Sequence, residues 1–185
     1  MNDFYIALGA NLPSSKGSPS KTLKSAVQIL EKPGVSVVAT SRFYQTPCFP
    51  PGAGPDYINA AVHLRSDLTP EALLENLHAI EADFGRERIE RWGMRTLDLD
   101  LLACGSRILP DLETYNAWRA LSPEAQKASA PDRLILPHPR LQDRAFVLVP
   151  LRDIAAEWRH PVLHKTVDDM YNALSPDDLA EIIPL

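Results

Sequence analysis

The chain has 185 residues, of which 45% are hydrophobic and 23% are charged, and its formal net charge is −5. This length suits one domain with a buried core, and the negative balance excludes a general electrostatic attraction to nucleic acid, so any phosphate-binding surface must be local. The two cysteines, Cys48 and Cys104, lack zinc-type spacing and fit a reduced cytoplasmic setting. The apolar run at residues 4–8 is too short for a signal peptide, and no run is long enough to span a membrane.

The first half of the chain predicts strands, one helix and one loop. Residues 4–9 read as a short buried strand, and residues 19–34 have apolar side chains at helical spacing until a Pro-Gly pair stops the helix. Residues 35–46 have strand composition. The prolines and glycines of residues 47–55 indicate a loop, and the alternating residues 56–66 predict the next strand.

The next elements complete a recognisable order. Residues 69–85 are the clearest helix, because Thr69 can cap it, Pro70 occupies its first position and Gly85 follows its end. Residues 96–104 then predict a strand. The order is β-α-β-β-α-β, which is typical of a ferredoxin-like α+β fold with an antiparallel sheet and two helices on one face.

The remaining chain is expected to decorate this core within one domain, residues 1–185. Residues 110–131 are polar and mostly helical, with a helix start at Pro123, and we interpret them as an insertion. The insertion could cover a nucleotide-binding edge or simply extend the surface, and we favour the second reading. After Pro150 we expect one amphipathic helix at about residues 167–174.

Two aspartates interrupt a leucine-rich strand. Alternation along the strand directs Leu97, Leu99 and Leu101 to one face and Asp98 and Asp100 to the other, with the two aspartates roughly 7 Å apart. Such a pattern can be an ordinary strand with a solvated acidic face. However, aspartate is a poor strand former, and closely spaced carboxylates are ligands that Mg²⁺ uses when a substrate supplies phosphates.

An arginine-rich segment precedes this strand. Residues 85–95 contain four arginines and two glutamates, a local balance of 4 − 2 = +2. The alternative is a solvated loop whose arginines pair with surface glutamates. Arginine binds phosphate through its planar fork, so beside the two aspartates we favour a phosphate-plus-metal site. The arginines concerned are Arg86, Arg88, Arg91 and Arg95.

Two further stretches can contribute to a site. The prolines of residues 135–146 predict an extended loop, from which His138, Arg140 and Arg144 project and after which Phe146 follows. A lone histidine there is weak evidence by itself. Near the proline-rich loop, Thr46, Tyr57 and Asn59 can line a small pocket suited to a flat heterocycle. Taken by themselves, these residues are better explained by ordinary loop packing.

Together these stretches resemble the 6-hydroxymethyl-7,8-dihydropterin pyrophosphokinase family. The similar segments are "YIALGANL", "SRFYQTPCF", "PDYINAAV", "IEADFGRERIERWGMRTLDLDLL" and "LPHPRLQDRAFVLVPL". The resemblance implies a ferredoxin-like fold and a transferase of folate biosynthesis. Its reaction would move pyrophosphate from ATP to the pterin hydroxymethyl group, releasing AMP. It also implies two Mg²⁺ ions and small-molecule substrates. We separately expect a cytoplasmic monomer with no nucleic-acid or membrane partner.

The resemblance also assigns roles to residues. Asp98 and Asp100 would bind the metal ions, and Arg86 and Arg95 would assist the transfer. The pterin would contact Thr46, Pro47, Phe49, Tyr57, Asn59, Trp92 and Phe146. ATP would contact His78, Glu81, Arg88, Arg91, Trp92, Arg95, Leu101, Arg133, Ile135, His138 and Arg144.

Two other classes remain as alternatives. A ferredoxin-like module that binds RNA would stack bases on aromatic side chains of its sheet, but here that face carries aspartates. A different Mg²⁺-nucleotide transferase could share the frame and use another acceptor.

Overall fold

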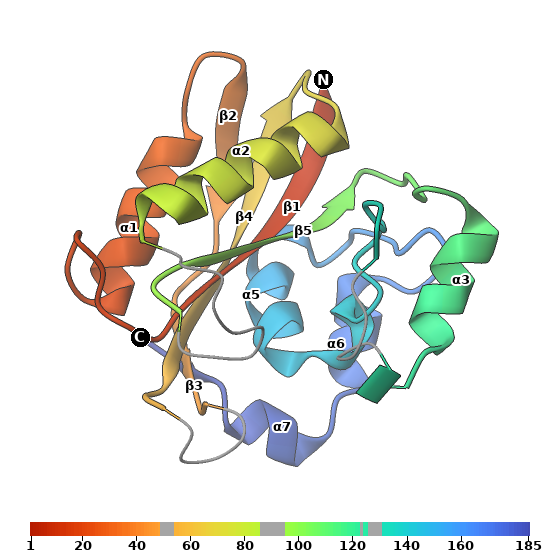
Figure 1. Ribbon diagram of the computed structural model, residues 1–185. Coiled ribbons are helices and arrows are strands. Elements are labelled where there is room, and N and C mark those ends of the chain that lie inside the picture. Colours follow the sequence, from red (N-terminus) through yellow and green to blue (C-terminus); the bar gives the residue numbers. More distant parts are fainter. Residues whose placement is uncertain (49–53, 86–94, 123, 126–130) are drawn as a thin grey trace.

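A computed structural model describes residues 1–48, 54–85, 95–122, 124–125 and 131–185 (Figure 1). The strands are β1 (Asn2–Ala10), β2 (Val35–Thr40), β3 (Tyr44–Thr46), β4 (Tyr57–Ser66), β5 (Asp98–Cys104) and β6 (Ile183–Pro184). The helices are α1 (Pro19–Leu30), α2 (Pro70–Asp83), α3 (Leu112–Ala120), a 3₁₀ turn (Leu141–Asp143), α5 (Ala145–Ala155), α6 (Val167–Asn172) and α7 (Pro176–Ala180). No helix among these described residues is long and apolar enough to cross a membrane.

The strands form one antiparallel sheet in the order β5-β1-β4-β3-β6, with β2 also paired to β4. This confirms the predicted α+β ferredoxin-like arrangement. The single strand expected over residues 35–46 is instead divided into β2 and β3 along the same edge of β4. Ser41 causes the break: its backbone N–H donates to the Ala61 carbonyl (2.9 Å), and its Oγ accepts from the Ala61 N–H (2.8 Å).

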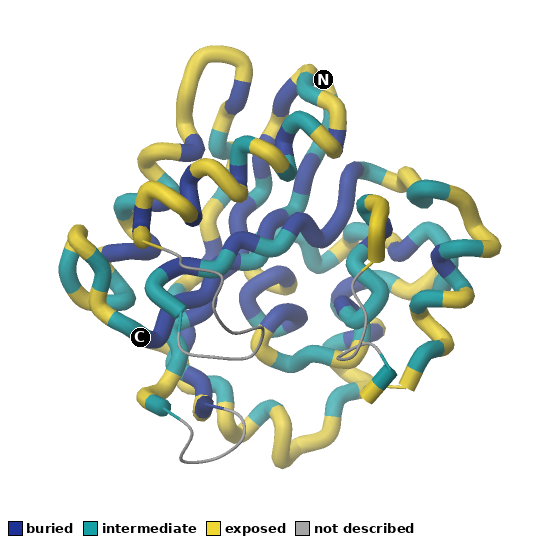
Figure 2. The backbone as a smooth tube through the Cα atoms, in the orientation of Figure 1, coloured by how far each residue is buried: buried dark blue, intermediate teal, exposed yellow. Residues whose placement is uncertain are grey.

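Helices α1 and α2 cover one face of the sheet (Figure 1). As predicted, Leu97, Leu99 and Leu101 point toward these helices and pack in one cluster with Leu73 and Leu77 of α2. Figure 2 shows the buried positions concentrated along the central strands. Because these leucines anchor one side of β5, the aspartates between them are held in place on the opposite face.

A helix that the sequence did not predict lies against that opposite face. In α5, Leu148 and Leu151 pack in a second cluster with Ala61 of β4 and Leu102 of β5. Pro150 lies inside this helix. Proline lacks the N–H needed within a helix, so it argued against helix here, but burial of the apolar face outweighs the lost hydrogen bond. The amphipathic helix expected near residues 167–174 is confirmed as α6.

The insertion is attached to the C-terminal part of the chain. Leu109 and Leu136 close its base with two backbone hydrogen bonds of 2.9 and 3.1 Å. Within α3, Tyr115 is fully buried, and its hydroxyl lies 3.0 Å from His160 Nε2. The helix start expected at Pro123 lies outside the described residues. Because its side chain is fully buried, Tyr115 packs as a core residue and not as part of the surface.

The buried His160 should make stability depend on pH. Its Nδ1 accepts hydrogen bonds from the Val162 and Leu163 N–H groups (3.2 Å each), and burial lowers its pKa to about 4 from 6.5. The unfolded chain then binds a proton between these values and the folded protein does not. His160 therefore does not reduce the free energy of unfolding well above pH 6.5, and it reduces this free energy progressively as the pH falls toward 4.

We expect the free energy of unfolding to fall by about 2 kcal/mol between pH 7 and pH 4.5 through this one histidine. Urea unfolding at both pH values measures the decline. His160→Gln should flatten the decline by that amount. An unchanged pH dependence in the variant would contradict the assignment.

Candidate active site

Three of the residues expected to carry chemistry, Asn59, Asp98 and Asp100, lie close to the end of β1. On the face opposite α1 and α2, Gly9 of β1 lies directly between Asn59 of β4 and Asp98 of β5. The next row in the same direction along the sheet contains Ala61, Ala7 and Asp100. Neighbouring strands are about 4.8 Å apart, so the backbones of Asn59 and Asp98 are about 10 Å apart, with Gly9 of β1 between them.

Asp98 is paired with Arg95 at the start of β5. The Arg95 Nη1 atom contacts Asp98 Oδ1, and about a fifth of each side chain is exposed. Burial alone would lower the pKa of Arg95, but the charges of Asp98 and Asp100 raise it above its usual value. The arginine is therefore always charged, and it partly offsets the carboxylate charge at this end of the strand.

Asp100 faces a second arginine from the loop before α5. Arg144 Nη1 lies 4.0 Å from Asp100 Oδ2, and the Asp100 side chain remains 40% exposed. The Arg144 guanidinium also lies 5.7 Å from the ring centre of Phe146. Burial lowers the pKa of Arg144, against the opposing effect of Asp100, but arginine stays charged at any ordinary pH. The two aspartates thus each face a cation, and each side chain remains partly exposed.

His138 is held as a neutral imidazole near these groups. Its backbone N–H donates to the Leu102 carbonyl (2.7 Å), and its Nδ1 accepts from the Arg140 N–H (3.1 Å). Burial, followed by the charge of Arg144, lowers its pKa to about 3. Because Nδ1 accepts, the proton of the neutral ring is on Nε2, which can donate to a ligand.

The Asn59 end of this row, opposite Asp98, carries side chains suited to binding a heterocycle. Asn59 Nδ2 donates to Thr46 Oγ1 (2.8 Å), and both residues are buried. Tyr57 is half-buried, and burial raises the pKa of its hydroxyl. An oriented amide beside an aromatic ring can read the polar edge of a flat ring.

A family comparison identifies the chain that carries this arrangement. The family described as "7,8-dihydro-6-hydroxymethylpterin-pyrophosphokinase (HPPK)" matches residues 5–156. The chain belongs to this pyrophosphokinase family.

Relatives and solved structures agree with the family match. A Synechocystis protein named "2-amino-4-hydroxy-6-hydroxymethyldihydropteridine pyrophosphokinase" is 39% identical over 88% of this chain and 71% of its own. A Haemophilus influenzae protein of the same name is 36% identical over 83% of this chain and 81% of its own. A crystal structure described as "HPPK-DHPS in complex with substrates" superposes with a TM-score of 0.64 at 13% identity. The superposition covers 94% of this chain and 45% of that longer chain. Because the identity is only 13%, this likeness supports the fold alone.

Glu81, one of the nucleotide contacts predicted from the pyrophosphokinase resemblance, has a structural partner. It is 1% exposed in α2, and its Oε1 accepts a hydrogen bond from the Leu99 N–H (2.7 Å). In the sheet formed by the described residues β5 is an edge strand, so this bond satisfies a backbone donor on its open side. Glu81 therefore links α2 to β5 and helps to hold the strand that carries the aspartates in position. Its contact with ATP stays a prediction.

The other predicted nucleotide contacts lie in different environments. Leu101 is buried among the core leucines on the helix side, so its side chain points away from the aspartates. Ile135 is also buried, whereas His78 and Arg133 are exposed. Of the expected pterin contacts, Pro47 is exposed and Phe146 is 41% exposed. The remaining predicted residues lie outside the described part of the chain: Phe49, Arg86, Arg88, Arg91 and Trp92.

Asn11 is a site residue that the sequence analysis missed. It is 2% exposed, its Oδ1 accepts from the Arg95 N–H (2.8 Å), and its Nδ2 donates to the Pro55 carbonyl (3.1 Å). Its backbone N–H donates to the Arg95 carbonyl (3.0 Å). One side chain thus joins the end of the arginine-rich segment to the end of the proline-rich loop. The only sequence signal was a polar residue directly after a buried strand.

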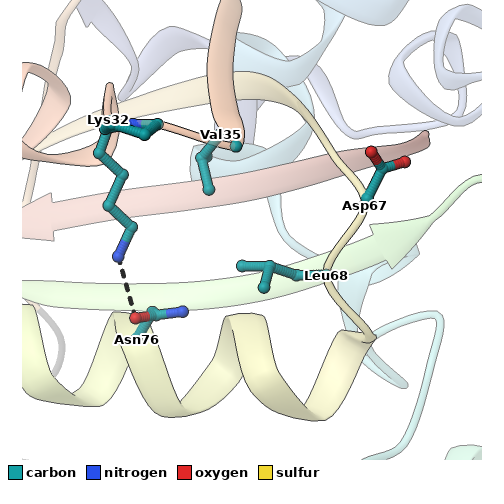
Figure 3. A pocket seen from close by; sticks show the side chains of 7 residues that line it. Lys32, Val35, Asp67, Leu68 and Asn76 are labelled. Atoms are coloured by element: carbon teal, nitrogen blue, oxygen red, sulfur yellow. Dashed lines mark hydrogen bonds between the residues drawn. The ribbon is translucent and has the colours of Figure 1, made fainter.

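A separate pocket lies at the other end of the sheet. It is formed where α1 meets β2 and where β4 meets α2, with Lys32 Nζ donating to Asn76 Oδ1 (2.9 Å) beside Val35 and Leu68 (Figure 3). Val35 pairs with the last residue of β4, whereas Asn59 lies near its first. The pocket is therefore remote from the aspartates and takes no part in the site.

Proposed function

We propose that this chain transfers the pyrophosphoryl group of ATP to the hydroxymethyl oxygen of 6-hydroxymethyl-7,8-dihydropterin in folate biosynthesis. The observation that carries the proposal is the row Asn59–Gly9–Asp98. On one side of the central strand β1 this row has the Asn59 amide, which can hydrogen-bond to a heterocycle. On the other side it has the Asp98 carboxylate, which would lie near the phosphates. Membership in the pyrophosphokinase family supports the same reaction.

The reaction requires a defined exchange of bonds. The hydroxymethyl oxygen attacks the β-phosphorus of ATP, the bond between that phosphorus and the oxygen bridging to the α-phosphorus breaks, and AMP leaves. The hydroxyl proton passes to solvent. Such transfers need in-line positioning and neutralisation of phosphate charge more than covalent help from the protein.

The described residues can supply that positioning and charge. Arg95 and Arg144 place two guanidinium groups beside the aspartates, where phosphate oxygens would gather. His138 adds a neutral Nε2–H donor that would stay unchanged throughout the physiological pH range. From outside the described residues, we propose that Arg86 assists the transfer and that Arg88, Arg91 and Trp92 contact ATP.

The carboxylates fit a magnesium site completed by substrate. Asp98 and Asp100 point from one face of one strand, and no group of three or more metal-binding side chains occurs among the described residues. This suits Mg²⁺, which commonly takes one or two carboxylates and fills its other positions with phosphate and water oxygens. We propose that these aspartates hold two Mg²⁺ ions, which when bound would neutralise and orient the triphosphate.

On the acceptor side, we propose that Asn59 and Thr46 read the polar edge of the pterin and that Tyr57 and Phe146 contact its ring. Pro47, Phe49 and Trp92 are the further proposed contacts. The ATP contacts proposed for His78, Glu81, Leu101, Arg133 and Ile135 rest on the family resemblance. We further propose that the protein acts as a monomer on small molecules in the cytoplasm. Its free, buried cysteines support the reducing compartment.

The test is to measure AMP released from ATP and Mg²⁺, with and without the reduced hydroxymethylpterin. AMP that forms only with the pterin is the expected result. ADP in place of AMP would mean that the γ-phosphorus is attacked, which contradicts pyrophosphoryl transfer. Absence of any pterin-dependent product would overturn the proposed reaction.

A further inference from the structure

Gly9 is the one position in the Asn59–Gly9–Asp98 row that has no side chain. A Cβ atom built on Gly9 would lie 3.0 Å from Asn59 Oδ1 and 3.8 Å from Tyr57 Cδ1. The first distance is shorter than a side-chain carbon normally tolerates. Glycine in a strand interior often marks a place where another group approaches the backbone closely.

The need for glycine here comes from space and not from backbone conformation. The described glycines with positive φ are Gly17, Gly34, Gly85 and Gly105, and Gly9 is not among them. An alanine could therefore adopt the Gly9 backbone without strain, and at such sites alanine usually stabilises a protein. A loss caused by alanine at Gly9 must then arise from the contact with Asn59.

Asn59 cannot easily move away from an added methyl group. Its Nδ2 is committed to Thr46 Oγ1 at 2.8 Å, and both side chains are buried. With the nitrogen held by Thr46, the carboxamide oxygen is turned toward Gly9. Displacing that oxygen would stretch the Thr46 hydrogen bond or rotate the amide out of its plane.

We propose that Gly9 is a positioning residue that sets the place of the Asn59 carboxamide and thereby the recognition of the flat heterocyclic acceptor. The absence of a side chain lets the Asn59 oxygen rest directly over β1. It also keeps the space between Asn59 and Asp98 open, where the reacting arm of the acceptor would cross from the ring to the phosphate. This inference rests on the proposed function for its substrate, but its structural core concerns Asn59 alone.

The first test is Gly9→Ala assayed for pterin-dependent AMP formation. We expect the KM for the pterin to rise about tenfold while the KM for ATP changes less than about twofold, because a shift of a few tenths of an ångström affects only the acceptor side. Ala7→Gly is the matched control, since it changes one methyl group in the same strand and on the same face. Equal effects on both substrates, or no effect, would overturn the proposal.

A double-mutant cycle tests whether the effect passes through Asn59. In an Asn59→Ala background, Gly9→Ala should change the pterin KM less than about twofold, because the oxygen that it would displace is gone. Additive effects would contradict the mechanism. Should Gly9→Ala alone fail to fold, recovery of folding in the double variant would support the clash, and its continued failure would overturn it.

A measurement without substrate separates this inference from the proposed reaction. The side-chain amide NMR signals of Asn59, assigned by their loss in Asn59→Ala, should shift in Gly9→Ala and stay in place in Ala7→Gly. Unshifted signals in Gly9→Ala would overturn the positioning role even in an active enzyme. Shifted signals in a protein without pterin-dependent activity would uphold it while the proposed function fails.

Discussion

Asp98→Ala is expected to lower AMP formation by at least about 10³-fold, because it removes a proposed metal ligand and leaves triphosphate charge without its partner. The fold should change little. The side chain lies at the first residue of β5 and is 20% exposed, and partly exposed ion pairs contribute about 1 kcal/mol or less to stability.

The experiment is AMP release at saturating substrates together with urea unfolding of the same preparations. Asp67→Ala is a suitable control, because Asp67 pairs with the N-terminal ammonium at the other end of the sheet and is largely exposed. That variant should keep wild-type activity. Retention of turnover in Asp98→Ala would remove the assignment of the metal site to this strand.

Arg95→Ala is expected to lower kcat by about 10² to 10³-fold, with a smaller effect on the KM for ATP. The arginine contacts Asp98 at the point where charge would accumulate during transfer, so its contribution should be greatest in the transition state. Arg95→Lys should recover part of the rate, because lysine restores the charge but not the planar fork.

Steady-state kinetics in both substrates separate these possibilities. Arg65→Ala provides a matched control, since Arg65 pairs with Asp3 on the same face but away from the row of Asn59 and Asp98. A rise in the KM for ATP with unchanged kcat would mean that Arg95 only binds nucleotide, and the proposed role in the transfer would be wrong.

Much of the fold could be predicted because local and tertiary requirements coincide. The alternation of leucine and aspartate in β5 places its two faces correctly, since one face is buried and a slip of one residue would bury carboxylates. The ends of α2 were also predictable: Thr69 accepts the Ala72 N–H at 3.2 Å, and Gly85 follows with a φ of +80°. In both places a local signal is decisive.

The misses share a different physical origin, which is contact between segments distant in sequence. Asn11 bonds partners 84 and 44 residues away, so no local pattern reveals its role. Helix α5 contains Pro150, and its local propensity opposed a helix that packing against the sheet stabilises. The division between β2 and β3 depends on Ser41 bonding to Ala61 of another strand.

The central place of β1 has a consequence for how this protein is made. During synthesis β1 leaves the ribosome before both of its neighbours, because β4 and β5 come about 50 and 90 residues later in the chain. Until then β1 has no partner on either side and exposes an apolar ribbon. Contacts of such long sequence separation form slowly, so the sheet, and with it the whole site, should close only after β5 has been synthesised.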